Sequence, residues 1–329
     1  MNQKYRALVV SEESGRYCRK IVERNLIDLP AGDVLINVKY SSLNYKDALS
    51  ATGNKGVTRK YPHTPGIDAA GIIVVSSSNK FGKGDEVLVT GYDLGMNTSG
   101  GFAEYIKVPA DWVIKLPRGM TLKESMIYGT AGFTAGLSLY KLEQCSEEKM
   151  EGEILVTGAT GGVGSLAVAI LAKKNYIVVA STGKKDKADF LKMLGAKEVI
   201  GRDEVDDKSG KALLNRRWKA AVDTVGGNIL ATIIKQMDYR GSVASCGNTY
   251  SSDLSTTVFP FILRGVNLLG INSAETPMDM RTKVWNKLAN EWKPDCLNEI
   301  YEECPLEKLS EKIDLILQGQ ITGRVIVKL

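Results

Sequence analysis

The chain has 329 residues, which is long for one hydrophobic core and predicts about two domains. Its composition is typical of a globular protein, with 43% hydrophobic residues, 25% charged residues and a formal net charge of +5. This mild charge argues against a dedicated nucleic-acid binder, which usually has a concentrated basic face, but it suits an acidic small molecule such as a phosphorylated cofactor.

Two absences narrow the chemistry and the location. The amino terminus has no apolar core of signal-peptide length, and no window approaches the ~20 apolar residues of a membrane span, so we expect a cytoplasmic protein with no membrane partner. His63 is the only histidine, which excludes a histidine-rich zinc site and leaves this residue alone to serve any Ser-His-Asp or Cys-His mechanism. The cysteines are far apart and odd in number, which argues against a disulfide framework: Cys18, Cys145, Cys246, Cys296 and Cys304.

The elements expected along the chain fall into two patterns. Residues 4–125 contain short apolar runs separated by Gly, Pro, Asn and Asp at roughly ten-residue intervals, which predicts a β-rich unit. Residues 121–144 change to a helical pattern, with Thr121 as the expected N-cap and Glu124 three residues later. From about residue 152 strands and helices alternate, which predicts a parallel sheet with helices on both faces. The sequence therefore predicts an α/β protein whose last strand is residues 323–329.

The most informative motif is "ILVTGATGGVGSLAVAILAKK", residues 154–174, in which an apolar strand runs into a glycine-rich turn and then into an apolar helix. Glycines at such a point allow a tight turn, and the helix N-terminus offers unpaired N–H groups to a pyrophosphate. The motif is a variant of the usual glycine pattern, and a purely structural turn is the alternative. The flanking strand and helix favour a dinucleotide site at Thr160, Gly161, Gly162 and Val163.

The end of the next strand predicts which dinucleotide binds. An NAD site typically has an acidic side chain ~20 residues after the glycines, where it holds the ribose 2′-hydroxyl. This chain instead reads "VVASTGKKDK", residues 178–187, and hydroxyl and ammonium groups suit a 2′-phosphate. We therefore predict NADPH, held by Ser181, Thr182, Gly183 and Lys184, with Arg202 as a further cation near the adenine edge; a solvated lysine turn is the alternative.

Several motifs in the same order resemble one family. These are "SSLNYKDAL" (41–49), "PGIDAAG" (65–71), "GTAGFTA" (129–135) and "PFILRGV" (260–266). The chain resembles the medium-chain dehydrogenase/reductase superfamily, in its quinone oxidoreductase-like YhdH/YhfP branch, which includes bacterial acryloyl-CoA reductases. The resemblance implies a GroES-like catalytic domain formed by residues 1–124 and 274–329 and a Rossmann domain formed by residues 125–273.

Zinc-dependent members of that superfamily differ at two places. Where they have a cysteine followed three residues later by aspartate, this chain has Asn44 and Asp47, and where they have Gly-His-Glu it has Gly66, Ile67 and Asp68. We therefore expect no zinc. Without a Lewis acid, hydride transfer to an activated double bond or a quinone needs less help than alcohol oxidation, because the acceptor delocalises the charge.

The resemblance also implies site residues. Tyr45 would contact the nicotinamide or donate to an acceptor oxygen, and Asn44 would polarise a carbonyl, with Asp47 as their support; the alternative is that Asn44 only shapes a turn and Tyr45 only packs. Arg324 would line the cleft or pair with a carboxylate to fasten the last strand. Further cofactor contacts are implied at Thr130 and Thr134, with helix packing as the alternative. The same holds for Asn248, Ile262 and Ser273, with an ordinary loop or core role as the alternative, and for Gln320.

These observations predict an NADPH-dependent, zinc-independent reductase that acts on a small α,β-unsaturated acyl compound such as acryloyl-CoA. An NADPH:quinone oxidoreductase is the alternative, and a non-catalytic cofactor- or RNA-binding protein is the alternative of another class. A basic run at Lys55, Arg59 and Lys60 would suit the phosphates of coenzyme A; a solvated run is the alternative. The resemblance also implies a homodimer, in which residues 261–272 would supply the edge of the Rossmann sheet; an internal strand is the alternative for this segment.

Overall fold

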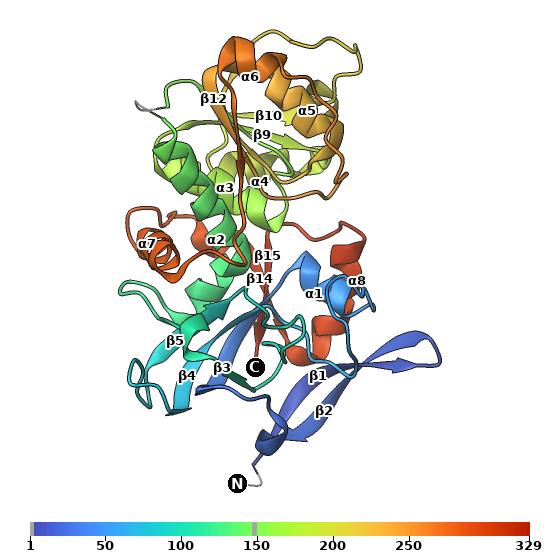
Figure 1. Cartoon of the computed structure of the whole chain (residues 1–329), viewed down its shortest axis with the longest axis vertical. Helices are drawn as coiled ribbons and strands as arrows, with labels where there is room; N and C mark the ends of the chain where they lie inside the picture. Colours follow the sequence, from blue (N-terminus) through green and yellow to red (C-terminus); the bar gives the residue numbers. More distant parts are fainter. Residues whose placement is uncertain (1–2, 147–149) are drawn as a thin grey trace. The chain divides into compact units, whose positions relative to one another are not determined.

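The computed structural model describes residues 3–146 and 150–329, which divide into two compact units (Figure 1). The first unit runs up to Thr130 and adds Ala274–Ala289 and Tyr301–Leu329, and the second comprises Ala131–Ser273 and Asn290–Ile300. Within the described ranges, no helix combines the length and the apolar character that crossing a membrane requires.

The first unit is built on antiparallel strands. Over its described residues the main sheet has seven strands in the order β14-β15-β3-β4-β5-β7, with β6 paired to β3. β14 and β15 alone run parallel, and the other pairs are antiparallel. Their bounds are β3 Val34–Leu43, β4 Asp68–Ser76, β5 Glu86–Thr90, β6 Tyr105–Val108, β7 Ile114–Lys115, β14 Tyr301–Pro305 and β15 Arg324–Lys328.

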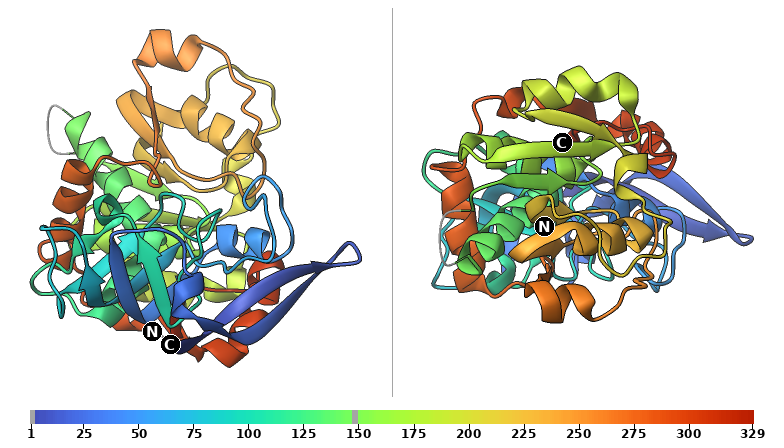
Figure 2. Two further views of the ribbon diagram at one scale, coloured as in Figure 1. Left: turned by 60° about the horizontal axis from the view of Figure 1, so that its bottom comes forward. Right: turned by 90° about the horizontal axis from the view of Figure 1, so that it is seen from above.

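Alternate residues of the sheet form the apolar core of this unit. Val34, Ile36 and Val38 of β3 are almost fully buried and pack with Val87 and Val89 of β5, as expected where side chains point to opposite faces in turn. A separate antiparallel ribbon, β1 Lys4–Glu13 and β2 Arg16–Asn25, projects from this unit (Figure 2). The helices are α1 Tyr45–Ser50, α7 Met278–Ala289, α8 Leu309–Leu317 and the 3-10 turns Leu26–Asp28, Ala110–Trp112 and Leu306–Lys308.

The second unit has a doubly wound parallel sheet. In its described part six strands lie in the order β10-β9-β8-β11-β12-β13, and every pair is parallel. Because the chain moves outward in opposite directions from β8 and β11, a ligand crevice is expected at the carboxyl ends of these two strands. The strands are β8 Glu153–Val156, β9 Ile177–Thr182, β10 Glu198–Gly201, β11 Trp218–Asp223, β12 Met237–Ser245 and β13 Asn267–Gly270.

Helices cover this sheet and bury its apolar residues. Ile229 and Ile233 of α5 pack in one core with Leu155 of β8, Trp218 of β11 and Val243 of β12. The helices are α3 Gly162–Lys173, α4 Ala188–Met193, α5 Gly227–Gln236 and α6 Phe259–Arg264, with 3-10 turns at Lys185–Lys187, Arg202–Val205 and Leu297–Glu299. The predicted α/β fold class, with a β-rich unit and a doubly wound parallel-sheet unit, is confirmed.

One helix belongs to both units. α2, Leu122–Gln144, begins with the predicted capping box, in which Thr121 and Glu124 exchange hydrogen bonds between side chain and backbone. Its helical geometry breaks at Gly129, where φ is 51° and ψ is −156°, one residue before the chain leaves the first unit. This break places Gly129 and Thr130 over the buried polar residues described next.

Candidate active site

A buried carboxylate organises the first unit at the start of β4. Asp68 is fully buried, and its Oδ2 accepts hydrogen bonds from Ser42 Oγ at 2.6 Å and Asn44 Nδ2 at 2.8 Å. The same Oδ2 accepts from the Thr130 N–H at 2.9 Å, and Oδ1 accepts from Thr130 Oγ1 at 2.6 Å. Charge-assisted bonds of this kind offset the cost of burying a carboxylate. Asp68 therefore joins β3, the start of α1 and the break in α2.

Arg324, the first residue of β15, brings a cation to the same place. It is 3% exposed, and its guanidinium donates to the carbonyls of Leu43 and Ile127 at 3.1 Å each. It also donates to Ser42 Oγ at 2.8 Å and Asn44 Oδ1 at 3.3 Å. Its Nη2 lies 3.9 Å from Asp68 Oδ2, and burial lowers the pKa of the guanidinium. The interpretation that Arg324 pairs with a carboxylate to fasten the last strand is thus confirmed.

Asp47, a buried residue of α1, accepts hydrogen bonds from the N-cap of that helix and from the loop at residues 66–67. Its Oδ1 accepts from the N–H groups of Gly66 and Ile67 at 3.1 and 2.8 Å, and its Oδ2 accepts from the Asn44 N–H at 2.8 Å and Asn44 Nδ2 at 3.3 Å. Burial, aided by the charge of Asp68, raises the pKa of Asp47 to about 7, while the N–H donors act in the opposite direction. This carboxyl holds residues 66–67 against α1.

The same contacts separate the roles of Asn44 and Tyr45. Asn44 is the N-cap of α1; its amide N–H groups face Asp68, Asp47 and the Ser42 carbonyl, and its Oδ1 accepts from Arg324. Because the amide already bonds within the protein, the geometry favours the structural alternative for Asn44 over a group that polarises a substrate. Tyr45 begins α1 and is 48% exposed, so its phenol is accessible to a ligand.

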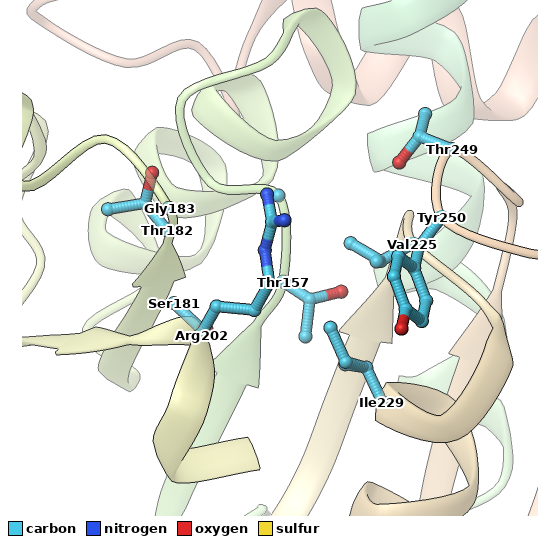
Figure 3. Close-up of a pocket in the computed structure, with 10 residues that line it drawn as sticks. Thr157, Ser181, Thr182, Gly183, Arg202, Val225, Ile229, Thr249 and Tyr250 are labelled. Carbon is cyan, nitrogen blue, oxygen red and sulfur yellow. The ribbon is translucent and has the colours of Figure 1, made fainter. Parts of the chain in front are cut away.

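The second unit has a cavity of about 100 Å³ at the carboxyl ends of β8, β9, β10 and β11 (Figure 3). Figure 3 shows Arg202 on one side, facing Val225 and Tyr250 on the other. Four of the predicted cofactor residues meet here: Ser181, Thr182, Gly183 and Arg202. Gly158 of the glycine-rich motif also lines the cavity, and five further lining residues were not predicted from the sequence: Thr157, Val225, Ile229, Thr249 and Tyr250. The rule that ligands bind at the carboxyl ends of parallel strands indicates Val225, which follows β11 closely, whereas Thr249 and Tyr250 lie in a loop without a local signal.

The glycine turn beside this cavity is shaped for close backbone packing. At Gly158 φ is +56°, and a Cβ there would lie 2.3 Å from Thr224 Oγ1. A Cβ on Gly164 would lie 2.3 Å from the Gly158 carbonyl oxygen. α3 begins at Gly162 with Gly161 as its N-cap and no side-chain cap, so the first-turn N–H groups, including that of Val163, remain suited to an anion.

The end of β9 has the polar character that the sequence predicted. Ser181 and Thr182 are buried, and Thr182 Oγ1 accepts from the Lys184 N–H at 3.0 Å and lies 3.2 Å from Thr160 Oγ1. A Cβ on Gly183 would lie 2.8 Å from a guanidinium nitrogen of Arg202, so only glycine lets this cation lie so close to the chain. Burial lowers the pKa of Lys184. The residues that line the cavity include a guanidinium and no carboxylate.

The remaining predicted contacts lie elsewhere. Thr134 is buried within α2, Asn248 is exposed after β12, and Ser273 is the last residue before the chain returns to the first unit. Ile262 is 67% exposed on α6, and Gln320 is exposed after α8. None of these five lines the cavity of Figure 3, so they stay predictions.

Comparisons with known proteins show the family to which the chain belongs. The family model of the alcohol dehydrogenase GroES-like domain matches residues 30–118, and that of zinc-binding dehydrogenase matches residues 162–290. The putative quinone oxidoreductase YhfP of Bacillus subtilis is 51% identical over 92% of both chains. The chain belongs to the medium-chain dehydrogenase/reductase family. Within that family it belongs to the quinone oxidoreductase-like YhdH/YhfP branch. The chain is therefore an oxidoreductase, and the alternative of a non-catalytic cofactor- or RNA-binding protein has no support.

Other members of this family extend the likeness. Acrylyl-CoA reductase AcuI of Ruegeria pomeroyi is 43% identical over 98% of both chains. The crystal structure of the yhdH oxidoreductase from Salmonella enterica in complex with NADP has a TM-score of 0.96 and 41% identity, over 98% of this chain and 99% of that one. The structure of B. subtilis yhfP with NAD bound has a TM-score of 0.97 and 48% identity, over 99% and 100%.

The family includes zinc enzymes, but the residues of this medium-chain reductase do not fit zinc. Ile67 is apolar, and the carboxylates of Asp47 and Asp68 already accept from several N–H and O–H groups. Within residues 3–146 and 150–329 no cluster of three or more His, Cys, Asp or Glu side chains could hold a metal ion. We therefore derive no step through zinc.

Proposed function

We propose that this chain is an NADPH-dependent, zinc-independent reductase of the activated double bond in a small α,β-unsaturated acyl compound, such as an acryloyl-CoA-like thioester. The observation that carries the proposal is the 43% identity to the acrylyl-CoA reductase AcuI, which extends over 98% of both chains. Members that share both domains at this level support a common reaction class, although fold alone does not specify a substrate.

The choice of NADPH is supported by the cavity in the second unit. The yhdH structure contains NADP, whereas the yhfP structure contains NAD, so these relatives do not agree on the cofactor. In this chain Ser181, Gly183 and Arg202 line the cavity, with Lys184 next in sequence. Donors without a carboxylate favour a 2′-phosphate over a free 2′-hydroxyl. The N-terminus of α3 would hold the pyrophosphate.

Each group then has a limited task. When bound, NADPH would supply the hydride for the β-carbon of the acceptor, and Tyr45 or solvent would supply the proton for its α-carbon. Tyr45 is accessible and directly follows Asn44, the N-cap of α1. The Asn44 side chain is held in place by hydrogen bonds with Asp68 and Arg324. Thr134, Asn248, Ile262, Ser273 and Gln320 are proposed to line the nicotinamide, as the resemblance implies. Asn44 acts as framework.

A quinone reductase is the second candidate, because YhfP carries that description at 51% identity. Steady-state assays with NADPH distinguish the two. We expect a higher kcat/KM for acryloyl-CoA than for 1,4-naphthoquinone. A large preference for the quinone would reject the enoyl proposal and favour the second candidate.

We also propose that the chain forms a homodimer through the edge of the second unit's sheet. β13 is one of the two edge strands of the described sheet, and apolar side chains on it or in the segment before it are exposed to between 37% and 67%: Val258, Phe259, Ile262, Leu263 and Leu268. An exposed apolar patch beside an open strand edge is costly in a monomer. Sedimentation of Leu263→Asp should show a shift from dimer to monomer, and a monomeric native chain would reject this proposal.

A further inference from the structure

The chain crosses between the two units four times, after Thr130, Ser273, Ala289 and Ile300. The first two of these crossings, the first and second passages, are fastened near one pair of strand residues in the first unit. Asp68 of β4 and Thr90 of β5 are directly opposite each other in the antiparallel ladder. Each of the two passages is fastened to this pair by a buried charged side chain.

The first passage is fastened by Asp68. Its carboxylate accepts hydrogen bonds from the N–H and the hydroxyl of Thr130, at 2.9 and 2.6 Å. These bonds act on the residue that directly follows the break at Gly129, so the carboxylate caps the part of α2 that enters the second unit. Thr134 is four residues later, which is about one helical turn and therefore on the same face as Thr130.

The second passage is fastened by Arg281 of α7. This guanidinium is fully buried and donates to the Thr90 carbonyl at 2.8 Å and to Thr90 Oγ1 at 3.1 Å. It also donates to the Ala274 carbonyl at 2.9 Å, and the same carbonyl accepts from the Tyr92 N–H at 3.1 Å. The guanidinium lies 4.5 Å from the centroid of the Tyr92 ring. Ser273 is the residue next to Ala274.

We propose that Asp68 and Arg281 are positioning residues that set the two chain passages, and through them Thr134 and Ser273, for hydride transfer. The functional part of this inference rests on the proposed reductase activity. Burial argues for the role, because a charged side chain that is removed from water and bonded to a chain passage fixes that passage more tightly than an exposed contact does. The sequence did not indicate Arg281.

Two variants of the full-length chain test the inference. Thr130→Val keeps the shape of the residue but removes the hydroxyl that Asp68 accepts, and Thr130→Ser restores that hydroxyl. Arg281→Lys keeps the charge but cannot reproduce the forked contacts with Thr90 and Ala274. Thr58→Val is the matched control, because Thr58 is a buried threonine of the first unit whose hydroxyl bonds Ser50.

Amide hydrogen exchange gives a readout that does not depend on turnover. We expect faster exchange over residues 127–136 in Thr130→Val and over residues 271–277 in Arg281→Lys, with wild-type exchange at both segments in Thr130→Ser and Thr58→Val. With a working acceptor, kcat should fall about tenfold or more in the two altered variants, since small misplacements are costly in hydride transfer. The dissociation constant of NADPH should stay within about twofold, because the cavity of Figure 3 is unchanged.

The outcomes separate the two proposals. Unchanged exchange at both passages would overturn the anchoring, whatever the activity. Equal losses of kcat, NADPH affinity and melting temperature in the altered variants and in Thr58→Val would overturn a specific positioning role. If the wild-type chain oxidises no NADPH with any enone or quinone, the proposed function fails, and altered exchange would then still support the anchors alone.

Discussion

The polar residues of the two units are used in opposite ways. In the first unit, the side chains of Asp47, Asp68 and Arg324 are buried, and their polar atoms form hydrogen bonds with other protein groups of the same unit. In the second unit, hydroxyls, glycines and a guanidinium surround a cavity that a ligand can enter. Polar residues in a family motif can therefore build either a framework or a binding surface, and only their contacts distinguish the two.

The largest expected effect comes from Asp68→Ala, which leaves Arg324 buried without its carboxylate. We expect the free energy of unfolding to fall by about 3–5 kcal/mol, the cost of an uncompensated buried charge. Urea denaturation measures this loss, and the double variant Asp68→Ala, Arg324→Met should recover part of it. A loss under about 1 kcal/mol would mean that the cluster does not stabilise the framework.

A pH titration examines Asp47 in the same cluster. Its pKa is about 7 in the folded chain, above the ordinary value of 3.8, so the carboxyl takes up a proton on folding. Its contribution to stability is fully present below about pH 4 and is lost as the pH rises through about 7, with a change of about 3 kcal/mol between pH 5 and 8. Unfolding of Asp47→Asn should lack this dependence; identical pH profiles would contradict the shift.

Arg202→Gln tests the open site of the second unit. We expect NADPH affinity to fall about tenfold and NADH affinity to change little, because only NADPH presents a phosphate to the guanidinium. Fluorescence titration with both nucleotides gives the ratio. Lys187→Gln is the control, since Lys187 lies outside the cavity and pairs with Asp186. An equal loss of affinity for NADPH and NADH would indicate that Arg202 contacts the adenine rather than the 2′-phosphate.

Lys184→Glu should act in the same direction, by a smaller amount. The new carboxylate would repel the 2′-phosphate and spare NADH, and a change of about fivefold in the affinity ratio is expected for a group at the edge of the cavity. The same titration measures it at two salt concentrations. An unchanged ratio would place the 2′-phosphate away from this turn.

The smallest effect concerns the basic run of the first unit. Lys55 pairs with Glu12 at 3.2 Å and lies over the rings of Tyr17 and Tyr61, so it already has partners. Arg59 and Lys60 are exposed. Replacing both with alanine should raise KM for a coenzyme A thioester about threefold and leave KM for a quinone unchanged, because exposed ion pairs are weak. An unchanged KM for the coenzyme A thioester would mean that these basic side chains are only solvated.

The sequence predicted the features that depend on neighbouring residues. The glycine turn before α3 and the polar end of β9 are readable because strand, turn and helix follow each other directly. The framework role of Asn44 was only an alternative, because its partners are at residues 68 and 324, far away in the sequence. Arg281 lies in an ordinary amphipathic helix, and its burial against Thr90 has no local signal.

Gly129 has a consequence for how this family can diverge. A Cβ at this position would lie 2.4 Å from Ser42 Oγ, 2.5 Å from Asp68 Oδ2 and 2.8 Å from Arg324 Nη2, and its φ is one that other residues rarely adopt. A substitution of Gly129 is therefore unfavourable unless the other three change with it. We expect these four positions to be inherited together as a single evolutionary character, and any homologue that lacks the glycine to have a different cluster beneath it.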